Sequence, residues 1–361
     1  MLDPLTYSWL GSFVLNGGHQ VFKVIKYEDL DNGKVKGNYI LIDVRSPKEY
    51  NAETIPGAIN IPIFDDTERE LIGTTYVQKD PELAKKIGLE AAAARLPAIY
   101  EQIAVLDKKY DKLILFCARG GFRSSSLVSL FMTIGVNIFK LDKGYKGYRA
   151  FINENLPKVI EGVRFVVLYG NTGTGKTHIL EHLKDSGRDI LDLEGCANHR
   201  GSTLGAVGLG KQNSQKMFES LIYDSLRNRK SDTVFVEGES RKIGKVIIPD
   251  YIYSKMSEGL NICINADIEN RIDNVLKDYV HGTDEELKSS LNFLRSQLGH
   301  VTIDRYIKMI DEREYRQVIK ELMIKYYDPH YEYKNRQYVE IFENVESSKT
   351  AKEIILWIEK C

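Results

Sequence analysis

A cysteine followed by two arginines offers the most reactive chemistry in this sequence. Cys117 ends the apolar run LILFC, and the segment ARGGFRS that follows contains Arg119 and Arg123. Where a strand gives way to a helix, backbone N–H groups and the helix dipole favour a thiolate or a bound anion. A thiolate is the nucleophile of sulfur chemistry, and two arginines would be costly beside an inert core cysteine. We therefore predict that Cys117, Arg119 and Arg123 are catalytic residues of a persulfide or perselenide carrier.

A phosphate-binding loop lies further along the chain. GNTGTGKT, residues 170–177, matches GxxxxGK[ST] in full, follows the apolar run VRFVVLY and precedes a helical pattern. Such a loop surrounds phosphate oxygens with backbone N–H groups, while Lys176 reaches the outer phosphates and Thr177 is suited to a magnesium ion. The predicted phosphate-binding residues are Gly170, Asn171, Thr172, Gly173, Thr174, Gly175, Lys176 and Thr177.

Acidic and cationic residues accompany this loop. Glu237 and Glu239 follow the run DTVFV, where many P-loop enzymes place an aspartate. Glutamate is atypical there, so we expect the P-loop to bind a diphosphate rather than to drive ATP hydrolysis. We expect no dedicated metal site, although a Mg²⁺ ion bound with the diphosphate remains compatible with these residues. His199 and Arg200 lie in a polar segment after a strand, and Arg241 follows the acidic strand end. These cations suit an anionic substrate, and we add all five residues to the active-site candidates.

Two sets of alternating strands and helices must position these residues. The first set has strands at 21–25, 39–44, 112–117 and 137–142 and helices at 84–109 and 124–134. The second has strands at 163–170, 189–193, 232–237 and 260–266, a charged helical region to residue 327, a strand near 338–342 and a last helix. This alternation indicates α/β folding on parallel sheets covered on both faces. We predict an N-terminal extension (1–20), a first domain (21–157) and a P-loop domain with a helical C-terminal region (158–361).

Composition fits an ordinary globular chain of two domains. The 361 residues are 43% apolar and 28% charged, with 50 Lys and Arg against 51 Asp and Glu. RNA binding would therefore depend on a local basic surface rather than on global charge. Four scattered cysteines without a CxxC pair fit a reducing cytoplasm better than a disulfide framework or a zinc site. With no signal peptide and no apolar run of about 20 residues, we expect a cytoplasmic protein without a membrane partner.

One local basic surface is suggested by the segment KGYKGYRAF. It interleaves lysines and an arginine with tyrosines, a mixture that can neutralise phosphates and stack on bases. The same pattern is also typical of a solvated face or a domain seam. The RNA-binding candidates in this segment are Lys143, Tyr145, Lys146, Tyr148 and Arg149.

The first domain resembles the rhodanese family. DVRSPKEY (43–50) and IPGAINIP (55–62) are similar to that family's two N-terminal signatures and precede the cysteine loop in the usual order. The first signature adds Asp43 and Arg45 to the active-site candidates. A typical rhodanese loop has four residues between cysteine and arginine, whereas five separate Cys117 from Arg123, as in Cdc25-type phosphatases. A larger loop suits a phosphate-sized or selenophosphate-sized anion.

The whole set of motifs resembles the tRNA 2-selenouridine synthase family, whose members fuse a rhodanese domain to a P-loop domain. Besides the two loops, the segments that carry this resemblance are DLEGCANHRGSTLGAVG (192–208), ESRKIGKVIIP (239–249) and KGYKGYRAF (143–151). The resemblance implies replacement of sulfur by selenium in the wobble 2-thiouridine of tRNA, with selenophosphate as donor. It also implies an S-geranylated intermediate made from geranyl diphosphate. The implied partner is tRNA with a wobble 2-thiouridine, and an enzyme that supplies selenophosphate is a possible second partner. The resemblance implies no tightly bound cofactor.

Two other functions remain compatible with these residues. A rhodanese-type sulfurtransferase or Cdc25-like phosphatase would use Cys117 and keep the P-loop domain for regulation, as the spacing Cys-x5-Arg permits. A nucleotide-dependent kinase or RNA-binding module would instead leave the rhodanese part as a silent scaffold. Glu237 and Glu239 disfavour this last function, since they stand where an aspartate is usual.

Overall fold

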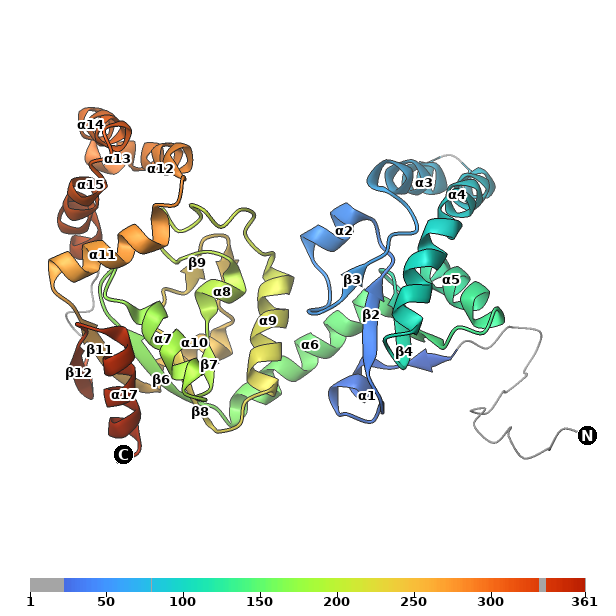
Figure 1. Ribbon diagram of the computed structural model, residues 1–361, viewed down its shortest axis with the longest axis horizontal. Coiled ribbons are helices and arrows are strands. Elements are labelled where there is room, and N and C mark those ends of the chain that lie inside the picture. Colours follow the sequence, from blue (N-terminus) through green and yellow to red (C-terminus); the bar gives the residue numbers. More distant parts are fainter. Residues whose placement is uncertain (1–22, 79, 331–335, 361) are drawn as a thin grey trace, which may run out of the picture. The chain divides into compact units, whose positions relative to one another are not determined.

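The computed structural model describes residues 23–78, 80–330 and 336–360, and the chain separates into two compact units, Met1–Phe151 and Ile152–Cys361 (Figure 1). The division falls inside helix α6 (Gly144–Glu161), and the predicted boundary at residue 157 lies in the same helix. The predicted N-terminal extension, residues 1–20, lies outside the described residues. Both units have the predicted α/β fold with parallel sheets.

The first unit is built on a five-stranded parallel sheet with the order β1-β5-β4-β2-β3. Its strands are β1 (Val24–Ile25), β2 (Tyr39–Asp43), β3 (Ile59–Asn60), β4 (Lys112–Phe116) and β5 (Ile138–Leu141). The central strand β4 is apolar throughout after its first residue because both faces of a parallel sheet are covered. Asp43 pairs with Phe116 across β2 and β4, so Cys117 follows at the same edge of the sheet as the end of β2.

Five helices accompany this sheet before α6. They are α1 (Tyr27–Asp31), α2 (Pro47–Ala52), α3 (Asp66–Gln78), α4 (Pro81–Asp107) and α5 (Phe122–Thr133). The helix predicted from residue 84 begins earlier because Asp80 caps its N-terminus and Pro81 occupies the first helical position. Helix α2 begins with a capping box, in which Ser46 and Glu49 satisfy each other's backbone N–H groups.

The second unit contains a five-stranded parallel sheet with the order β12-β11-β6-β8-β7. Its strands are β6 (Arg164–Tyr169), β7 (Ile190–Leu191), β8 (Thr233–Glu237), β11 (Leu260–Asn265) and β12 (Glu340–Glu343), with a separate antiparallel pair β9 (Lys242–Ile243) and β10 (Val246–Ile247). Leu168 pairs with Glu237 across β6 and β8. The end of β8 therefore lies beside the start of the P-loop.

Helices surround this sheet and form a separate cluster after β11. Those interspersed with or following the sheet strands are α7 (Lys176–Asp185), α8 (Leu193–Ala197), α9 (Gln215–Arg227), α10 (Asp250–Ser257) and α17 (Ser347–Ile358). The helical region contains α11 (Ile268–Tyr279), α12 (Asp284–Leu291), η1 (Asn292–Leu294), α13 (Arg295–Leu298), α14 (His300–Asp311), α15 (Tyr315–Leu322), the π-helical turn η2 (Met323–Tyr327) and α16 (Asp328–His330). This region has its own hydrophobic cluster, distinct from the cluster at the sheet. None of the helices in the described part of the chain is long and apolar enough to cross a membrane.

Candidate active sites

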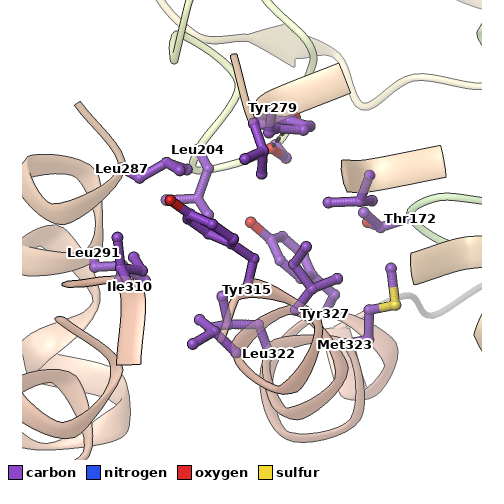
Figure 2. Close-up of a pocket in the computed structure, with 15 residues that line it drawn as sticks. Thr172, Leu204, Tyr279, Leu287, Leu291, Ile310, Tyr315, Leu322, Met323 and Tyr327 are labelled. Atoms are coloured by element: carbon purple, nitrogen blue, oxygen red, sulfur yellow. Dashed lines mark hydrogen bonds between the residues drawn. The ribbon is translucent and has the colours of Figure 1, made fainter. Parts of the chain in front are cut away.

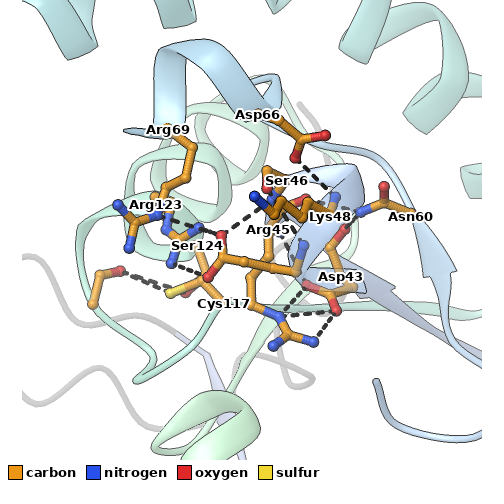
Figure 3. Close-up of polar contacts among 12 residues, drawn as sticks. Asp43, Arg45, Ser46, Lys48, Asn60, Asp66, Arg69, Cys117, Arg123 and Ser124 are labelled. Carbon is orange, nitrogen blue, oxygen red and sulfur yellow. Dashed lines mark hydrogen bonds and ion pairs between the residues drawn. The ribbon is translucent and has the colours of Figure 1, made fainter. Parts of the chain in front are cut away.

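The thiol of Cys117 lies directly after β4 and is only 3% exposed. Its Sγ is 3.2 Å from Oγ of the buried Ser124 and 3.9 Å from the carbonyl oxygen of Gly121 (Figure 3). Gly121 is the N-cap of α5, so the reactive atom sits where the chain enters that helix. The N-terminal end of a helix favours a bound anion. Ser124 was not predicted as a site residue, although it lies in the loop segment itself.

The two arginines of the loop differ in their settings. Arg123 makes a bidentate ion pair with Glu49 on α2, with N–O distances of 2.5 and 3.2 Å. Burial raises the pKa of Glu49, but the hydrogen bond and charge of Arg123, helped by Arg69, outweigh it and hold that pKa below its usual value. Arg119 is exposed at the surface of the unit. Arg123 is therefore held in a fixed position by Glu49, which lies within the first signature but was not among the predicted site residues.

Asp43 and Arg45 form an ion pair that is almost completely buried, with exposures of 0% and 4%. Nη2 of Arg45 lies 2.7 Å from the Asp43 carboxylate and donates to the carbonyl oxygen of Glu53 at 2.6 Å. Thr54 donates to the same carboxylate, and the Arg45 guanidinium stacks 4.4 Å from the ring centre of Tyr145. Neither charge faces solvent, and this ion pair contacts Glu53, Thr54 and Tyr145.

The segment predicted to contact tRNA is divided by burial. Tyr145, Tyr148 and Arg149 are buried, whereas Lys143 and Lys146 are exposed. The prediction that the two tyrosines stack on bases is corrected by this burial, because a buried ring offers no face to a base. Positions 145, 148 and 149 share one face of α6 through the helical repeat, and this face packs inward. Only the two lysines keep the predicted exposure.

The same segment supports the cysteine loop through the backbone. The amides of Tyr145 and Lys146 donate to the carbonyl oxygens of Cys117 and Ala118, each at 2.9 Å. Gly144 has a φ of +54°, and a Cβ there would overlap the carbonyl oxygen of Cys117. The start of α6 therefore fixes the conformation of the reactive loop.

The P-loop connects β6 to α7 in the second unit and folds around its own lysine. Nζ of Lys176 donates to the carbonyl oxygens of Gly170 at 2.8 Å and Asn171 at 3.2 Å. Gly173 and Gly175 have φ values of +82° and +83°, which L side chains rarely adopt. Because both of these acceptors are neutral carbonyls, a phosphate oxygen would be a stronger hydrogen-bond partner for the ammonium.

Side chains from far along the chain hold the P-loop from outside. Arg271 donates to the carbonyl oxygen of Thr172 at 2.9 Å, Asn274 to that of Gly173 at 2.9 Å, and Asn344 to that of Thr174 at 2.7 Å. Arg271 is itself held by a bidentate ion pair with the carboxylate of Asp328, which also accepts from Asn171. These positioning residues were not predicted, since no local spacing connects them with the loop.

Three carboxylates gather near Lys176. One oxygen each from Glu194, Glu237 and Glu239 lies within 4.8 Å of the others. Glu237 is 1% exposed, and its Oε1 has no hydrogen-bond partner among the described residues. Burial and the charge of Glu239 raise the pKa of Glu237 to about 8 against the opposing effect of Lys176, and burial likewise raises the pKa of Glu194 and Glu239. Where the sequence predicted no dedicated metal site, this cluster fits a divalent cation that prefers oxygen ligands.

The predicted cations of the second unit have three different settings. Arg200 lines the cleft over the P-loop, with its guanidinium 4.7 Å from the ring centre of Tyr279. His199 is buried, and burial lowers its pKa, so we interpret it as a packing residue. Arg241 is exposed and pairs with Asp250. Of these predicted cations, Arg200 is the one that lines the cleft.

The cleft has a volume of about 790 Å³ and contains the P-loop lysine, Thr177 and the three carboxylates. An apolar pocket in the helical region adjoins it (Figure 2). The residues that line both spaces are Thr172, Ser202, Val275, Tyr279 and Tyr327. A polar cleft and an apolar pocket thus meet at the P-loop.

Both units match the models of known protein families. Residues 163–361 match the tRNA 2-selenouridine synthase AAA domain, and residues 26–151 match the rhodanese-like domain. A tRNA 2-selenouridine synthase of Pseudomonas fluorescens (strain Pf0-1) is 31% identical over 81% of this chain and 87% of its own length. The corresponding protein of Nitrosomonas europaea is 35% identical over 66% of this chain, which spans 63% of that relative.

A solved structure is also similar to part of the chain. A rhodanese-related protein from Thermoplasma volcanium covers 37% of this chain and 93% of its own, with 23% identity and a TM-score of 0.22. The predicted rhodanese-like domain followed by a P-loop domain is confirmed by the two family matches. The chain belongs to the tRNA 2-selenouridine synthase family, whose members named above are enzymes that act on tRNA.

Proposed function

We propose that this protein is a tRNA 2-selenouridine synthase, a transferase that replaces sulfur by selenium in the wobble 2-thiouridine of tRNA. Selenophosphate is the selenium donor, and the reaction passes through an S-geranylated nucleoside made from geranyl diphosphate. The observation that carries this proposal is the meeting of a polar P-loop cleft with an apolar pocket in a chain of this family. A charged diphosphate joined to a hydrocarbon tail matches those two environments.

In the geranylation step the P-loop binds the diphosphate group of geranyl diphosphate. The tRNA sulfur forms a bond to the first carbon of the geranyl group, while the bond from that carbon to the diphosphate oxygen breaks. The electron pair leaves with the diphosphate, and Lys176 and the loop N–H groups stabilise its charge. We further propose that Glu194, Glu237 and Glu239 hold Mg²⁺ when diphosphate is bound. The cation would supply additional charge stabilisation to the leaving group.

In the selenation step the Cys117 loop binds the selenium donor. Selenophosphate is an anion, and the N-terminal end of α5 together with Arg123 suits an anion beside the thiol. The exposed Arg119 can reach an incoming phosphate of tRNA or donor. The selenium of selenophosphate then forms a bond to C2 of the nucleobase while the bond from C2 to the geranylated sulfur breaks, and the sulfur departs as geranyl thiol. Water then cleaves the phosphorus–selenium bond, which releases phosphate and leaves 2-selenouridine.

The two steps can be tested separately with Cys117→Ser. We expect this variant to geranylate thiolated tRNA at the wild-type rate and to lose selenation by at least about 100-fold. Lys176→Ala should lose geranylation, and with it the selenation of thiolated tRNA, but should still selenate tRNA that is supplied already S-geranylated. Loss of geranylation with selenation intact in Cys117→Ser would contradict this division of labour. Rapid hydrolysis of an aryl phosphate by the wild-type protein would favour the Cdc25-like alternative.

A further inference from the structure

An apolar chamber opens beside the P-loop within the helical region of the second unit. Its wall is made mainly of aliphatic side chains from α11, α12, α14 and α15, and the π-helical turn η2 contributes Met323 and Tyr327 (Figure 2). Two of the tyrosine hydroxyls in the wall have polar partners. Tyr315 donates to the Asp284 carboxylate at 2.9 Å, and the Tyr279 hydroxyl lies 3.2 Å from Oγ of Ser202. The chamber therefore offers a guest almost only hydrocarbon contacts.

The shape of the chamber restricts what can enter it. Its free volume is about 50 Å³, a few times the roughly 10–15 Å³ that one water molecule requires. A space of this size holds only a few heavy atoms of a thin chain, so a ten-carbon tail enters fully only if the wall moves. Met323 is a long, flexible side chain that can move to admit more atoms. The mouth is formed with the P-loop, since Thr172 lines both the chamber and the cleft.

We propose that this chamber binds the isoprenoid tail of the diphosphate substrate and that its far end limits the length of the tail. The inference rests on the proposed function, which places the diphosphate head at Lys176. Figure 2 shows Thr172 and Met323 on one side of the chamber and Leu287, Leu291 and Ile310 on the other. A tail that enters past Thr172 therefore ends against the last three side chains.

The burial of the far-end side chains makes them a firm limit. Leu291 and Ile310 are 1% and 2% exposed and belong to the hydrophobic cluster of the helical region. Side chains so closely packed can yield only by disturbing their neighbours, so extra carbons beyond this point would be costly. Each CH₂ group that is buried increases the affinity about fourfold. A tail that fits the chamber along its whole length gains this increase for every one of its carbons.

The test is calorimetry on the full chain with Mg²⁺ and four probes: inorganic diphosphate and the dimethylallyl, geranyl and farnesyl diphosphates. For the wild-type protein we expect geranyl diphosphate to bind at least about 100-fold tighter than inorganic diphosphate, and farnesyl diphosphate to gain nothing further. Ile310→Phe should abolish most of the geranyl gain while inorganic diphosphate binds within about twofold of wild type. That retained binding also shows that the variant is folded.

Two further variants complete the design. Met309→Phe is the matched control, because Met309 belongs to the same hydrophobic cluster and adjoins Ile310 but does not line the chamber. It should keep the geranyl gain. Leu291→Ala should lengthen the chamber and shift the affinity ratio of farnesyl to geranyl diphosphate by about tenfold in favour of farnesyl.

The outcomes separate this inference from the proposed function. Equal binding of inorganic and geranyl diphosphate by the wild-type protein would overturn the chamber and remove the support that the apolar pocket gives to geranylation, while the diphosphate site at the P-loop would stand. An unchanged geranyl gain in Ile310→Phe would also overturn it. If the wild-type protein bound no diphosphate at all, both the inference and the proposed diphosphate site would fail.

Discussion

Gly144 lies directly against the carbonyl oxygen of Cys117, at a φ of +54°, and no side chain fits between them. The first turn of α6 thereby holds the loop that carries the reactive thiol. Two backbone hydrogen bonds, from Tyr145 to Cys117 and from Lys146 to Ala118, complete this contact. The segment KGYKGYRAF therefore supports the cysteine loop through its backbone, and its two tyrosines are buried.

Gly144→Ala should therefore damage the selenium site. The new methyl group would overlap Cys117 and force the loop to shift, at a cost of at least about 3 kcal/mol in unfolding free energy. Selenation should fall with it, while diphosphate binding in the second unit stays unchanged. Gly33→Ala is the control, because Gly33 has a φ of +68° with no atom near its missing Cβ, and should cost only about 1 kcal/mol. Equal unfolding free energies for the two variants would contradict the predicted overlap.

Glu237→Gln tests the carboxylate cluster. Because the pKa of Glu237 is raised to about 8, its carboxyl is mostly neutral at pH 7, and a neutral glutamine should leave the protein without ligands as stable as wild type. The same change should weaken Mn²⁺ binding in the presence of inorganic diphosphate by at least about tenfold, as measured by electron paramagnetic resonance. The exposed Glu258 provides the control variant Glu258→Gln, which should behave as wild type. Unaltered Mn²⁺ affinity in Glu237→Gln would remove this residue from the proposed metal site.

Glu321→Gln tests the electrostatics of the helical region around the chamber. The Glu321 carboxylate accepts from Arg305 at 3.1 Å, Tyr306 at 3.1 Å and Lys325 at 2.6 Å, and these contacts, Arg305 above all, lower its pKa to about 2. Its stabilising effect is fully present above the unfolded-state pKa of about 4 and is lost as the pH falls toward 2.

Denaturant unfolding measures this effect. The substitution should lower the free energy of unfolding by about 1 to 3 kcal/mol at pH 7, and the difference from wild type should shrink between pH 5 and pH 2. The exposed Glu353 supplies the control Glu353→Gln, which should change stability by less than about 0.5 kcal/mol. A difference between Glu321→Gln and wild type that is constant with pH would show that the carboxylate charge is not responsible.

The two reactive loops could be predicted from the sequence because each is a contiguous motif between a strand and a helix. Cys117 and Lys176 both lie in that context in the structure. The parts that hold the loops could not be predicted, because Asn344 reaches Thr174 across 170 positions of the chain. Helical spacing could have indicated that Tyr145 and Tyr148 share one face, since the two positions are three apart, but no helix was predicted over this segment.

The carboxylate cluster shows a further limit of the sequence. Glu237 and Glu239 were recognisable at a strand end, but Glu194 comes from helix α8, and only the fold brings it to them. The chamber is formed by side chains on several helices whose mutual packing no local pattern describes. Contacts of this kind depend on tertiary packing rather than on spacing along the chain.

The central claim is tested most directly by the products that the wild-type protein makes on tRNA. The protein is incubated with thiolated tRNA, geranyl diphosphate, selenophosphate and Mg²⁺, and the digested nucleosides are weighed by mass spectrometry. We predict that 2-selenouridine forms in the complete reaction and that S-geranyl-2-thiouridine accumulates when selenophosphate is omitted. Recovery of unmodified 2-thiouridine alone from both reactions would contradict the account.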